Sequence, residues 1–469
     1  MLKLRPYQED LVNKIRASYK EGKKSTLAVA PTGAGKTVIF SYIASTVAAR
    51  GKRVLILVHR IELLRQTSRA LTKAGVDQAL INPKYTPDYR KNVQVASVQT
   101  LVNRLKHIKD VDLIVVDECH HATAGSWRKI IAEYPQALIL GVTATPIRGD
   151  GIGLGVHCGG LFDDMVEGPQ ISELIRLGYL VKPVVYAPIE RLDLTGVKIT
   201  RGDYDKEEIA KRVDKPKITG DAITHYKKLC PGVPTVVFCV SVAHAEHVAD
   251  EFRAAGFRAY SVDGSMEDDT RDRILGGLGN GSVDVVCSCD LISEGTDIPA
   301  IGCAILLRPT QSTGLYIQQI GRALRPCEGK DRAIILDHVG NTLIHGMPEE
   351  VREWTLDGEV KKKKRGKAAE PTVRVQQCPT CFAMHAPAPD CLVCGHIYVV
   401  KQPTQEEGEL KIVGEREALI IKQRRNVEVA QAKTLQELEQ IAIDRGYKPG
   451  WAKHIFAARE KRTPQNITT

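Results

Sequence analysis

Unbroken apolar runs alternate along residues 26–336 with longer stretches in which apolar positions recur at helical spacing. Runs rich in Val, Ile and Leu are typical of strands buried on both faces of a parallel sheet. They form two series: Thr26–Ala30, Val54–Val58, Val93–Ala96, Leu113–Val116 and Leu138–Val142, then Thr235–Val240, Ala259–Val262, Val283–Cys287, Ala304–Leu307 and Ala333–Leu336. Alternation of such strands with helices predicts an α/β fold in which a doubly wound parallel sheet occurs twice.

The segments outside these two series differ in character. A glycine-rich stretch precedes a predicted short helix over Ile171–Leu177 and a predicted strand over Val181–Ala187. Far downstream, Thr434 and Glu437 form a capping-box pattern that opens a helix, and a second helix is predicted from Trp451. We therefore expect six regions: sheet domains over 1–150 and 233–346, a connection over 151–232, a basic linker over 347–373, a cysteine-rich unit over 374–400 and a helical tail over 401–469.

The composition is that of a globular protein with a basic excess. The 469 residues include 66 Lys and Arg against 56 Asp and Glu, a formal net charge of +10. Such an excess is compatible with a polyanionic partner but does not identify one. The apolar runs are too short to cross a bilayer and no apolar leader is visible, so we expect a cytoplasmic protein without a membrane partner.

A glycine-rich turn follows the first predicted strand and precedes a helical pattern, with the sequence Ala30-Pro31-Thr32-Gly33-Ala34-Gly35-Lys36-Thr37. This is the context of a phosphate-binding loop, in which backbone N–H groups and a helix N-terminus approach phosphate oxygens. Lys36 is expected to reach the β- and γ-phosphates, and Thr37 to hold Mg²⁺. The general pattern begins with glycine, where this chain has Ala30.

An acidic pair, Asp117 and Glu118, follows the buried run Leu113–Val116. The ends of buried parallel strands form the rim at which ligands bind an α/β sheet. We expect Asp117 to help hold Mg²⁺ and Glu118 to orient or deprotonate an attacking water.

Two arginines, Arg322 and Arg325, are spaced three residues apart in a predicted helix of the second series. This spacing places them on one helical face. Guanidinium groups are planar and permanently charged, so they suit bidentate phosphate contacts and the stabilisation of charge in phosphoryl transfer.

The ordered set of motifs over residues 2–340 resembles the superfamily 2 helicases, the DEAD/DEAH-box-like group. The resemblance implies two tandem RecA-like domains that bind ATP and Mg²⁺ in the cleft between them. It implies an adenine contact from Gln8, beside Arg5, in the segment 4–8. The whole loop Thr32, Gly33, Ala34, Gly35, Lys36 and Thr37 then holds the phosphates, and Arg322 and Arg325 reach across the cleft as fingers.

Weaker segments complete the resemblance. Segments similar to motifs Ia, Ib and IV imply nucleic-acid contacts from Arg60, Gln99, Thr100 and Ser241. A motif III pattern implies that Thr143 and Thr145 couple hydrolysis to strand movement, together with Gln318 of motif VI. The motif V pattern implies nucleotide contacts from Gly295 and Asp297 and a nucleic-acid contact from Thr296.

Departures from the RNA-handling DEAD-box proteins favour DNA. No aromatic residue lies upstream of Leu4, the acidic motif ends in Cys119-His120, and motif VI opens with Gln318. These features resemble bacterial RadD-type repair helicases and phage branch-migration helicases. That resemblance implies forked, branched or single-stranded DNA as the partner, in a bacterial or phage-infected cell.

Four cysteines form a doubled knuckle, Cys378-x-x-Cys381 and Cys391-x-x-Cys394. The pattern predicts a structural zinc ribbon with four thiolate ligands, because such a ligand set leaves no open coordination position. His385 and His396 lie nearby as possible substitute ligands. The ribbon and the basic run over 361–367 are expected either to form an accessory DNA-binding surface together, or to be a small structural unit and a solvated linker.

We therefore expect an ATP-driven DNA helicase. Three alternatives stay open at this point: a double-stranded DNA translocase without processive unwinding, an RNA helicase, and a non-catalytic zinc-dependent nucleic-acid adaptor.

Overall fold

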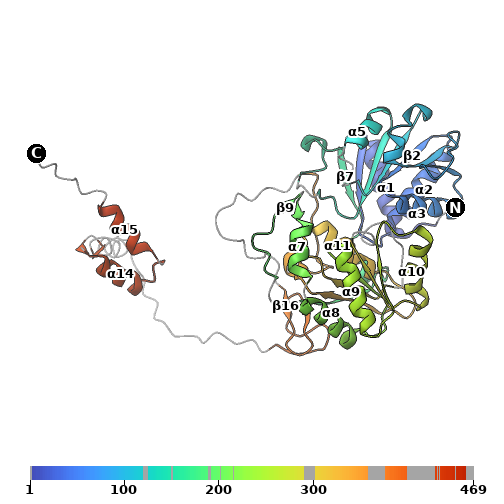
Figure 1. Cartoon of the computed structure of the whole chain (residues 1–469). Coiled ribbons are helices and arrows are strands. Elements are labelled where there is room, and N and C mark those ends of the chain that lie inside the picture. Colours follow the sequence, from blue (N-terminus) through green and yellow to red (C-terminus); the bar gives the residue numbers. More distant parts are fainter. Residues whose placement is uncertain are drawn as a thin grey trace, which may run out of the picture. The chain divides into compact units, whose positions relative to one another are not determined.

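The computed structural model divides the chain into two units, residues 1–398 and 399–469, which are described separately. The described residues are 3–119, 125–148, 152–188, 192–200, 202–214, 216–289, 301–357, 375–398, 428–429, 431–432, 434–448 and 450–460. The larger unit holds two large sheets, one parallel and one mostly parallel, and we call the part built on each sheet a lobe (Figure 1).

The first lobe is built on a seven-stranded sheet with the order β3-β4-β2-β5-β6-β1-β7. Every neighbouring pair in it is parallel. Its strands are β1 (Ser25–Val29), β2 (Val54–Val58), β3 (Gln78–Ile81), β4 (Val93–Ser97), β5 (Leu113–Asp117), β6 (Leu138–Thr143) and β7 (Asp164–Glu167). The predicted apolar runs of the first series are all strands of this sheet.

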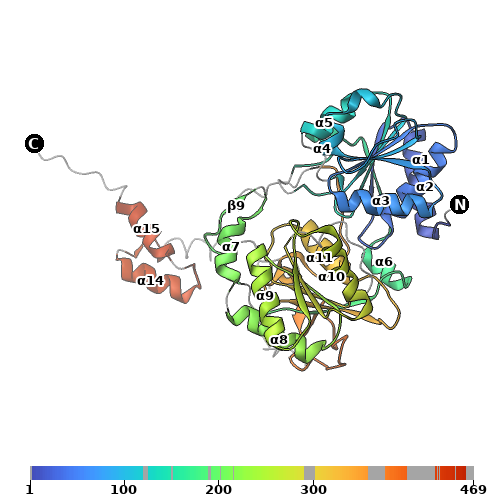
Figure 2. The ribbon, with the colours of Figure 1, turned by 45° about the vertical axis from the view of Figure 1, so that its right-hand side comes forward.

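Helices cover both faces of the first sheet (Figure 2). One face packs against α1 (Pro6–Lys20), α2 (Lys36–Ala48) and α3 (Ile61–Lys73), and the other against α4 (Val98–Leu101) and α5 (Gly125–Ala132). Ile56 belongs to the first of these two cores and its neighbours Leu55 and Leu57 to the second. Alternation of side chains across the pleat therefore explains why β2 is apolar at every position.

The second lobe is built on an eight-stranded sheet with the order β12-β13-β11-β14-β15-β8-β17-β16. Its strands are β8 (Lys182–Tyr186), β11 (Thr235–Phe238), β12 (Ala259–Val262), β13 (Val285–Ser288), β14 (Cys303–Leu306), β15 (Arg332–Asp337), β16 (Gln376–Gln377) and β17 (Ala383–His385). Its helices are α8 (Pro216–Leu229), α9 (Val242–Ala254), α10 (Asp268–Asn280), α11 (Thr313–Ala323) and α12 (Asn341–His345).

The stretch expected to be an irregular connection, 151–232, is divided between the two sheets. Strand β7 pairs in parallel with β1, and β8 pairs in parallel with β15. Between them lie the short helix α6 (Ile171–Arg176) and the segment 177–181, and beyond β8 lie the hairpin β9 (Ile199–Thr200) and β10 (Asp203–Tyr204) and helix α7 (Lys206–Val213). The apolar run beginning at Val181 becomes buried because it extends a sheet, whereas a free linker would leave it exposed.

A 3-10 turn occupies Leu105–His107 and another occupies Val156–Cys158.

The cysteine-rich unit is also part of the second sheet. Its strand β17 pairs antiparallel with β8, so the ribbon covers an edge of the sheet that would otherwise be exposed. This continuity differs from the separate domain expected over 374–400.

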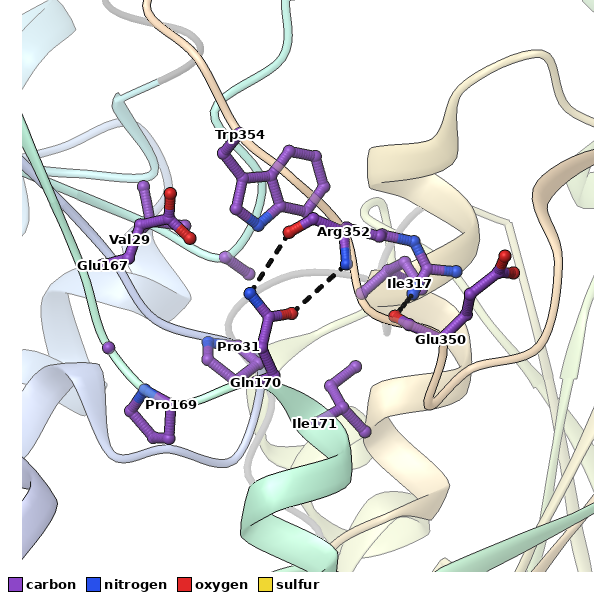
Figure 3. Close-up of a pocket in the computed structure, with 12 residues that line it drawn as sticks. Val29, Pro31, Glu167, Pro169, Gln170, Ile171, Ile317, Glu350, Arg352 and Trp354 are labelled. Atoms are coloured by element: carbon purple, nitrogen blue, oxygen red, sulfur yellow. Dashed lines mark hydrogen bonds between the residues drawn. The ribbon is translucent and has the colours of Figure 1, made fainter.

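A crossing segment, residues 347–357, returns from the second lobe to the first. Gln170 pairs with the backbone of Arg352: its Nε2 donates to the Arg352 carbonyl at 3.2 Å and its Oε1 accepts from the Arg352 N–H at 3.5 Å (Figure 3). Trp354 and Leu356 pack against the first-lobe core. The two lobes are therefore joined by two chain passages, one over 168–181 and one over 347–357.

The described residues of the smaller unit include helices α14 (Leu435–Asp444), which opens at the predicted capping box, and α15 (Trp451–Glu460). Thr434 Oγ1 accepts from the Glu437 N–H at 3.3 Å, and the Glu437 carboxylate accepts from the Thr434 N–H at 2.9 Å. These helices pack around a small buried core made of Ala432, Leu438, Ile441 and Ala452. No helix among the described residues has the length and apolar character needed to cross a membrane.

Candidate functional site

The turn between β1 and α2 requires glycine at two positions. Gly33 has φ +89° and Gly35, the N-cap of α2, has φ +81°, a region that side-chain-bearing residues rarely adopt. A Cβ on Gly35 would also lie 2.5 Å from Gln8 Nε2. The turn therefore opens the N-terminal amides of α2 toward the cavity beside it, as a phosphate-binding loop does.

The acidic pair lies opposite this loop, at the end of β5. Lys36 Nζ is 3.9 Å from Glu118 Oε1 and 3.4 Å from the Ala30 carbonyl oxygen. Glu118 has φ +46°, which is uncommon for a residue with a side chain, and Asp117 Oδ1 accepts from its N–H at 3.0 Å. Backbone strain of this kind is retained where the surroundings enforce it, and here it accompanies a carboxylate placed beside the loop lysine.

Burial sets the electrostatics of Lys36. Desolvation lowers its pKa from the ordinary lysine value, while the Glu118 and Asp117 carboxylates oppose that shift, and Arg322 and Arg325 add to it. Three cationic and two anionic side chains thus meet at one place, so an incoming polyanion would find an environment that favours it.

Helix α11 brings the second lobe against the phosphate loop. A Cβ on Gly321 would lie 2.7 Å from Thr32 Cβ, and one on Gly314 would lie 2.9 Å from Thr145 Oγ1. Both glycines are therefore required by the close approach of α11 to the first lobe. Thr145 in turn is held by Thr143, whose hydroxyl donates to the Thr145 carbonyl at 3.0 Å.

The two lobes together enclose a cavity of about 340 Å³. The residues that line it are Arg5, Thr32, Gly33, Gly35, Lys36, Thr37, Val38, Leu63, Gln66, Asp117, Glu118, Tyr179, Gln318, Arg322, Arg325 and Pro326. The structure therefore brings together the loop, the acidic pair and the arginine pair. Arg322 belongs to α11, whereas Arg325 lies two residues beyond its last helical residue, so the pair shares the cavity but not a continuous helix.

Gln8 is occupied by contacts within the protein. It is 3% exposed, its Oε1 accepts from the Arg5 N–H at 3.0 Å, and its Nε2 donates to the Ala34 carbonyl at 3.0 Å. Tyr7 donates its hydroxyl to the same carbonyl at 3.0 Å. Gln8 thus fastens α1 to the phosphate loop and does not line the cavity, whereas Arg5 does.

Tyr179 is the cavity residue that the sequence patterns did not identify. It lies between α6 and β8, and the Arg5 guanidinium carbon is 4.2 Å from the centre of its ring. A single tyrosine in a predicted connection belongs to no recognisable motif, so its position at the cavity is visible only in the folded structure.

The predicted nucleic-acid contacts of the first lobe lie at neighbouring strand ends. Arg60 is the N-cap of α3 after β2, and Gln99 and Thr100 follow β4. Gln99 Nε2 donates to the His59 carbonyl at 3.1 Å, which joins the two segments. In the second lobe, Ser241 is the N-cap of α9 after β11. The motif V residues Gly295, Thr296 and Asp297 lie outside the described residues.

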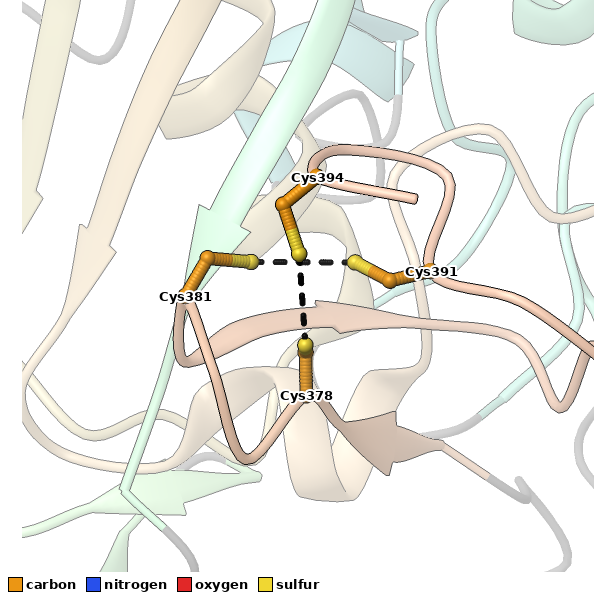
Figure 4. Close-up of side chains that lie close together, drawn as sticks. All are labelled: Cys378, Cys381, Cys391 and Cys394. Atoms are coloured by element: carbon orange, nitrogen blue, oxygen red, sulfur yellow. Dashed lines mark hydrogen bonds between the residues drawn. The ribbon is translucent and has the colours of Figure 1, made fainter. Parts of the chain in front are cut away.

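The four cysteines converge on one point, and their sulfur atoms all lie within 4.8 Å of one another (Figure 4). The Sγ atoms of Cys378 and Cys394 are 3.6 Å apart, as are those of Cys381 and Cys391. Tetrahedral zinc with Zn–S bonds of about 2.3 Å requires sulfur separations of about 3.8 Å, whereas a disulfide requires about 2.05 Å. The donor set and spacing therefore fit Zn²⁺.

The two nearby histidines have other partners. His385 Nε2 is 2.8 Å from the Tyr398 hydroxyl, and His396 Nδ1 is 2.9 Å from Thr380 Oγ1. Both contacts hold the ribbon loops together, which leaves the metal site to the four thiolates.

Comparisons with known proteins agree with this arrangement. Residues 1–148 match the family model "Type III restriction enzyme, res subunit", and residues 221–327 match "Helicase conserved C-terminal domain". A 51.5 kDa protein of a Lactococcus phage is 33% identical, over 86% of this chain and 87% of that protein. The putative ATP-dependent helicase IRC3 of Saccharomyces cerevisiae is 32% identical, over 72% of this chain and 51% of that protein.

The fold is shared with solved structures. The ATP-dependent Type ISP restriction-modification enzyme LlaBIII, solved bound to DNA, superposes with a TM-score of 0.53 at 19% identity. The match covers 72% of this chain and 27% of that one.

Proposed function

Because this chain belongs to the superfamily 2 helicases, we propose that it is a DNA-dependent ATPase that unwinds or remodels forked or branched DNA. ATP-dependent helicase activity of the superfamily 2 type is the general function of the family. The observation that carries the proposal is that α11 and the turn after it present Arg322 and Arg325 to the same cavity as Lys36 and Glu118.

The residues of the first lobe hold and activate the reacting groups. The loop amides and Lys36 bind the β- and γ-phosphates of ATP, whose negative charge favours the charged form of a lysine whose pKa burial has lowered. Thr37 and Asp117 both line the cavity and offer the oxygen ligands that Mg²⁺ prefers. Bound Mg²⁺ supplies neutralisation of phosphate charge. Glu118 orients the attacking water and accepts its proton.

The residues of the second lobe stabilise the charge that develops on the transferred phosphoryl group. Arg322 and Arg325 act there as fingers, a contribution worth roughly 10³- to 10⁵-fold in rate in other phosphoryl-transfer enzymes. Because α11 also contacts Thr32 and Thr145, phosphate release removes the charge that holds α11 against the loop. Hydrolysis thereby drives a relative motion of the two lobes. This motion is transmitted to DNA by residues at the strand ends: Arg60, Gln99, Thr100 and Ser241.

Several features favour DNA over RNA. The first lobe matches a restriction-enzyme family, and the LlaBIII structure was solved with DNA. The acidic motif continues into Cys119, and motif VI opens with Gln318, unlike the RNA-handling relatives. The restriction-enzyme match equally supports a second candidate, a double-stranded DNA translocase that moves without processive unwinding.

We further propose that Zn²⁺, held by Cys378, Cys381, Cys391 and Cys394, keeps the ribbon folded on the edge strand β8. Together with the basic run over 361–367, which lies outside the described residues, the ribbon then offers an accessory surface to DNA.

The test is the ATPase rate of the full chain on single-stranded, duplex, forked and four-way-junction DNA, with RNA of matched length. We expect stimulation by forked or branched DNA, little by RNA, and none in Glu118→Gln. Equal stimulation by RNA would contradict the DNA assignment. Fork unwinding and triplex displacement on the same preparation separate the helicase from the translocase, because the translocase displaces the triplex strand and leaves the fork paired.

A further inference from the structure

A cation–aromatic pair lines the proposed ATP cavity. Arg5 and Tyr179 both line the cavity, and the guanidinium carbon lies 4.2 Å above the tyrosine ring. The Tyr7 ring supports Tyr179 from a centroid distance of 5.1 Å, and its hydroxyl accepts from Arg5 Nη1 at 3.2 Å. The pair is therefore fixed in position before any ligand arrives.

The other groups of this segment are already committed. Gln8 and Tyr7 both donate to the Ala34 carbonyl and so serve the phosphate loop. Among the described residues that line the cavity, Tyr179 is the only aromatic one. A flat ligand with its phosphates on the loop thus finds in Arg5 and Tyr179 the planar surfaces suited to stacking.

We propose that the nucleobase of ATP stacks against the Arg5–Tyr179 pair, and that Tyr179 is an affinity determinant for the nucleotide. This inference rests on the ATP site of the proposed function and adds a residue to it. Aromatic and guanidinium faces both bind nucleobases by stacking.

The position of Tyr179 also connects base binding to the two lobes. Its neighbour Leu180 lies against the phosphate loop, where a Cβ on Gly33 would be 2.6 Å from Leu180 Cδ2. The next residue, Val181, donates its N–H to the Leu324 carbonyl at 2.9 Å, one residue before Arg325. A base held by Tyr179 therefore fixes the chain passage that sets the distance between the loop and the arginines.

The test compares two ligands that share phosphates and differ in the base. Binding of a fluorescent ADP analogue and its displacement by ADP or by inorganic tripolyphosphate are measured in the full chain, in Tyr179→Ala and in Arg5→Ala. We expect ADP to bind about tenfold more weakly to both variants, with tripolyphosphate affinity within twofold of the unmodified chain. Tyr179→Phe, which keeps the ring, should bind ADP normally, and so should Tyr260→Ala, which removes a surface tyrosine of the second lobe.

Two results would overturn the inference. Unchanged ADP affinity in Tyr179→Ala would show that the ring does not hold the base. An equal loss of ADP and tripolyphosphate affinity would show that Tyr179 only shapes the loop through Leu180. Failure of the proposed function looks different, because in that case the unmodified chain would bind neither ligand.

Discussion

Two helices in corresponding places begin in different ways: α2, which follows β1 in the first lobe, and α9, which follows β11 in the second. Strands β1 and β11 are the first strands of the two predicted series. Gly35 caps α2 in the left-handed conformation and offers no side chain to the amides of the first turn. Ser241 caps α9, and its hydroxyl accepts from the His244 N–H at 3.1 Å. One helix N-terminus is open to an anion, and the other is closed by its own residue.

Under the proposed function, this difference lets two lobes of similar architecture divide one reaction. The first lobe has a helix terminus without a side-chain cap beside Lys36, while the second lobe caps the corresponding terminus and contributes Arg322 from α11 and Arg325 from the turn after it. Because each lobe lacks what the other supplies, neither can complete the site alone. The following experiments alter one side of the comparison at a time.

Removing the loop lysine should have the largest effect. Lys36→Ala takes away the cation proposed to bind the β- and γ-phosphates at the open terminus of α2, and we expect ATPase activity to fall by roughly 10³-fold or more. Steady-state phosphate release with saturating DNA measures it. Lys52→Ala, a surface change in the same lobe, is the control, and a Lys36→Ala chain that kept a tenth of the activity would contradict the assignment.

Removing a ligand of the proposed zinc site should weaken the second lobe alone. Cys391→Ser should reduce the zinc content from one per chain to none and lower the Tm, because the ribbon covers the edge strand β8. Each kcal/mol lost corresponds to a fall of about 2–4 °C in a domain of this size. Metal analysis and thermal unfolding check this, with Cys158→Ser as the matched variant. A zinc-free chain of unchanged Tm would show that the ribbon does not stabilise the lobe.

Separating α11 from the phosphate loop should lower the rate with little loss of folding. Gly321→Ala puts a Cβ 2.7 Å from Thr32 Cβ, so α11 must move away from the loop and carry Arg322 and the adjoining Arg325 with it. We expect about a tenfold fall in kcat, which corresponds to roughly 1.4 kcal/mol. The same change at Gly276, in helix α10 with no atom nearby, should leave kcat as it is. Equal kcat values for the two variants would exclude the contact as a catalytic requirement.

Ion pairs between the lobes should have a smaller, salt-dependent effect. Asp268 at the start of α10 accepts from Lys84 at 2.9 Å and from Arg65 at 2.8 Å, and the hydrogen bonds from Lys84 and Arg65 lower its pKa to about 2. A carboxylate with a depressed pKa stabilises the folded state above its unfolded value, and this contribution is lost only as the pH falls toward 2.

The lobe contact should therefore be constant between pH 5 and pH 8 and weaken with salt. Asp268→Asn should lower ATPase activity by about threefold at low salt and by less at high salt. Asp193→Asn, at an exposed site away from this contact, serves as the control. An Asp268→Asn effect that does not change with salt would argue against the ion pairs.

Opening the second helix terminus should cost stability without affecting the chemistry. Ser241→Ala removes the cap of α9 and should destabilise the second lobe by about 1 kcal/mol, with the ATPase rate in the absence of DNA unchanged. Ser312→Ala, which removes the cap of α11 at a 3.2 Å contact with the Leu315 N–H, should lower both stability and ATPase rate. Denaturant unfolding and ATPase assays distinguish the two caps, and identical behaviour would remove the contrast between α9 and α11.

Much of this organisation could be predicted from the sequence because it depends on local patterns. Buried parallel strands can be recognised in the sequence as apolar runs. The phosphate loop, the acidic pair and the doubled cysteine knuckle are each defined by residues a few positions apart. Thr434 and Glu437 form the predicted capping box for the same reason.

What could not be predicted depends on pairing between distant segments. The sequence predicted a strand at β8 but placed it in a connection between the domains. Nothing in the residues around Val181 indicates that β15 and β17 flank this strand in the second sheet. Tyr179 reaches the cavity only because β8 extends the second sheet. The commitment of Gln8 to the Ala34 carbonyl likewise follows from the packing of α1 on the loop, 26 residues away in sequence.

The most direct test of a site completed by both lobes is a double-mutant cycle on the chemical step. Single-turnover hydrolysis with saturating ATP and DNA is measured in Lys36→Ala, in Arg325→Ala and in the double variant. If both residues act on one transition state, each single change slows the step by roughly 10³-fold and the double change slows it little further. Independent, multiplying losses, or an Arg325→Ala chain with an unchanged single-turnover rate, would contradict the account.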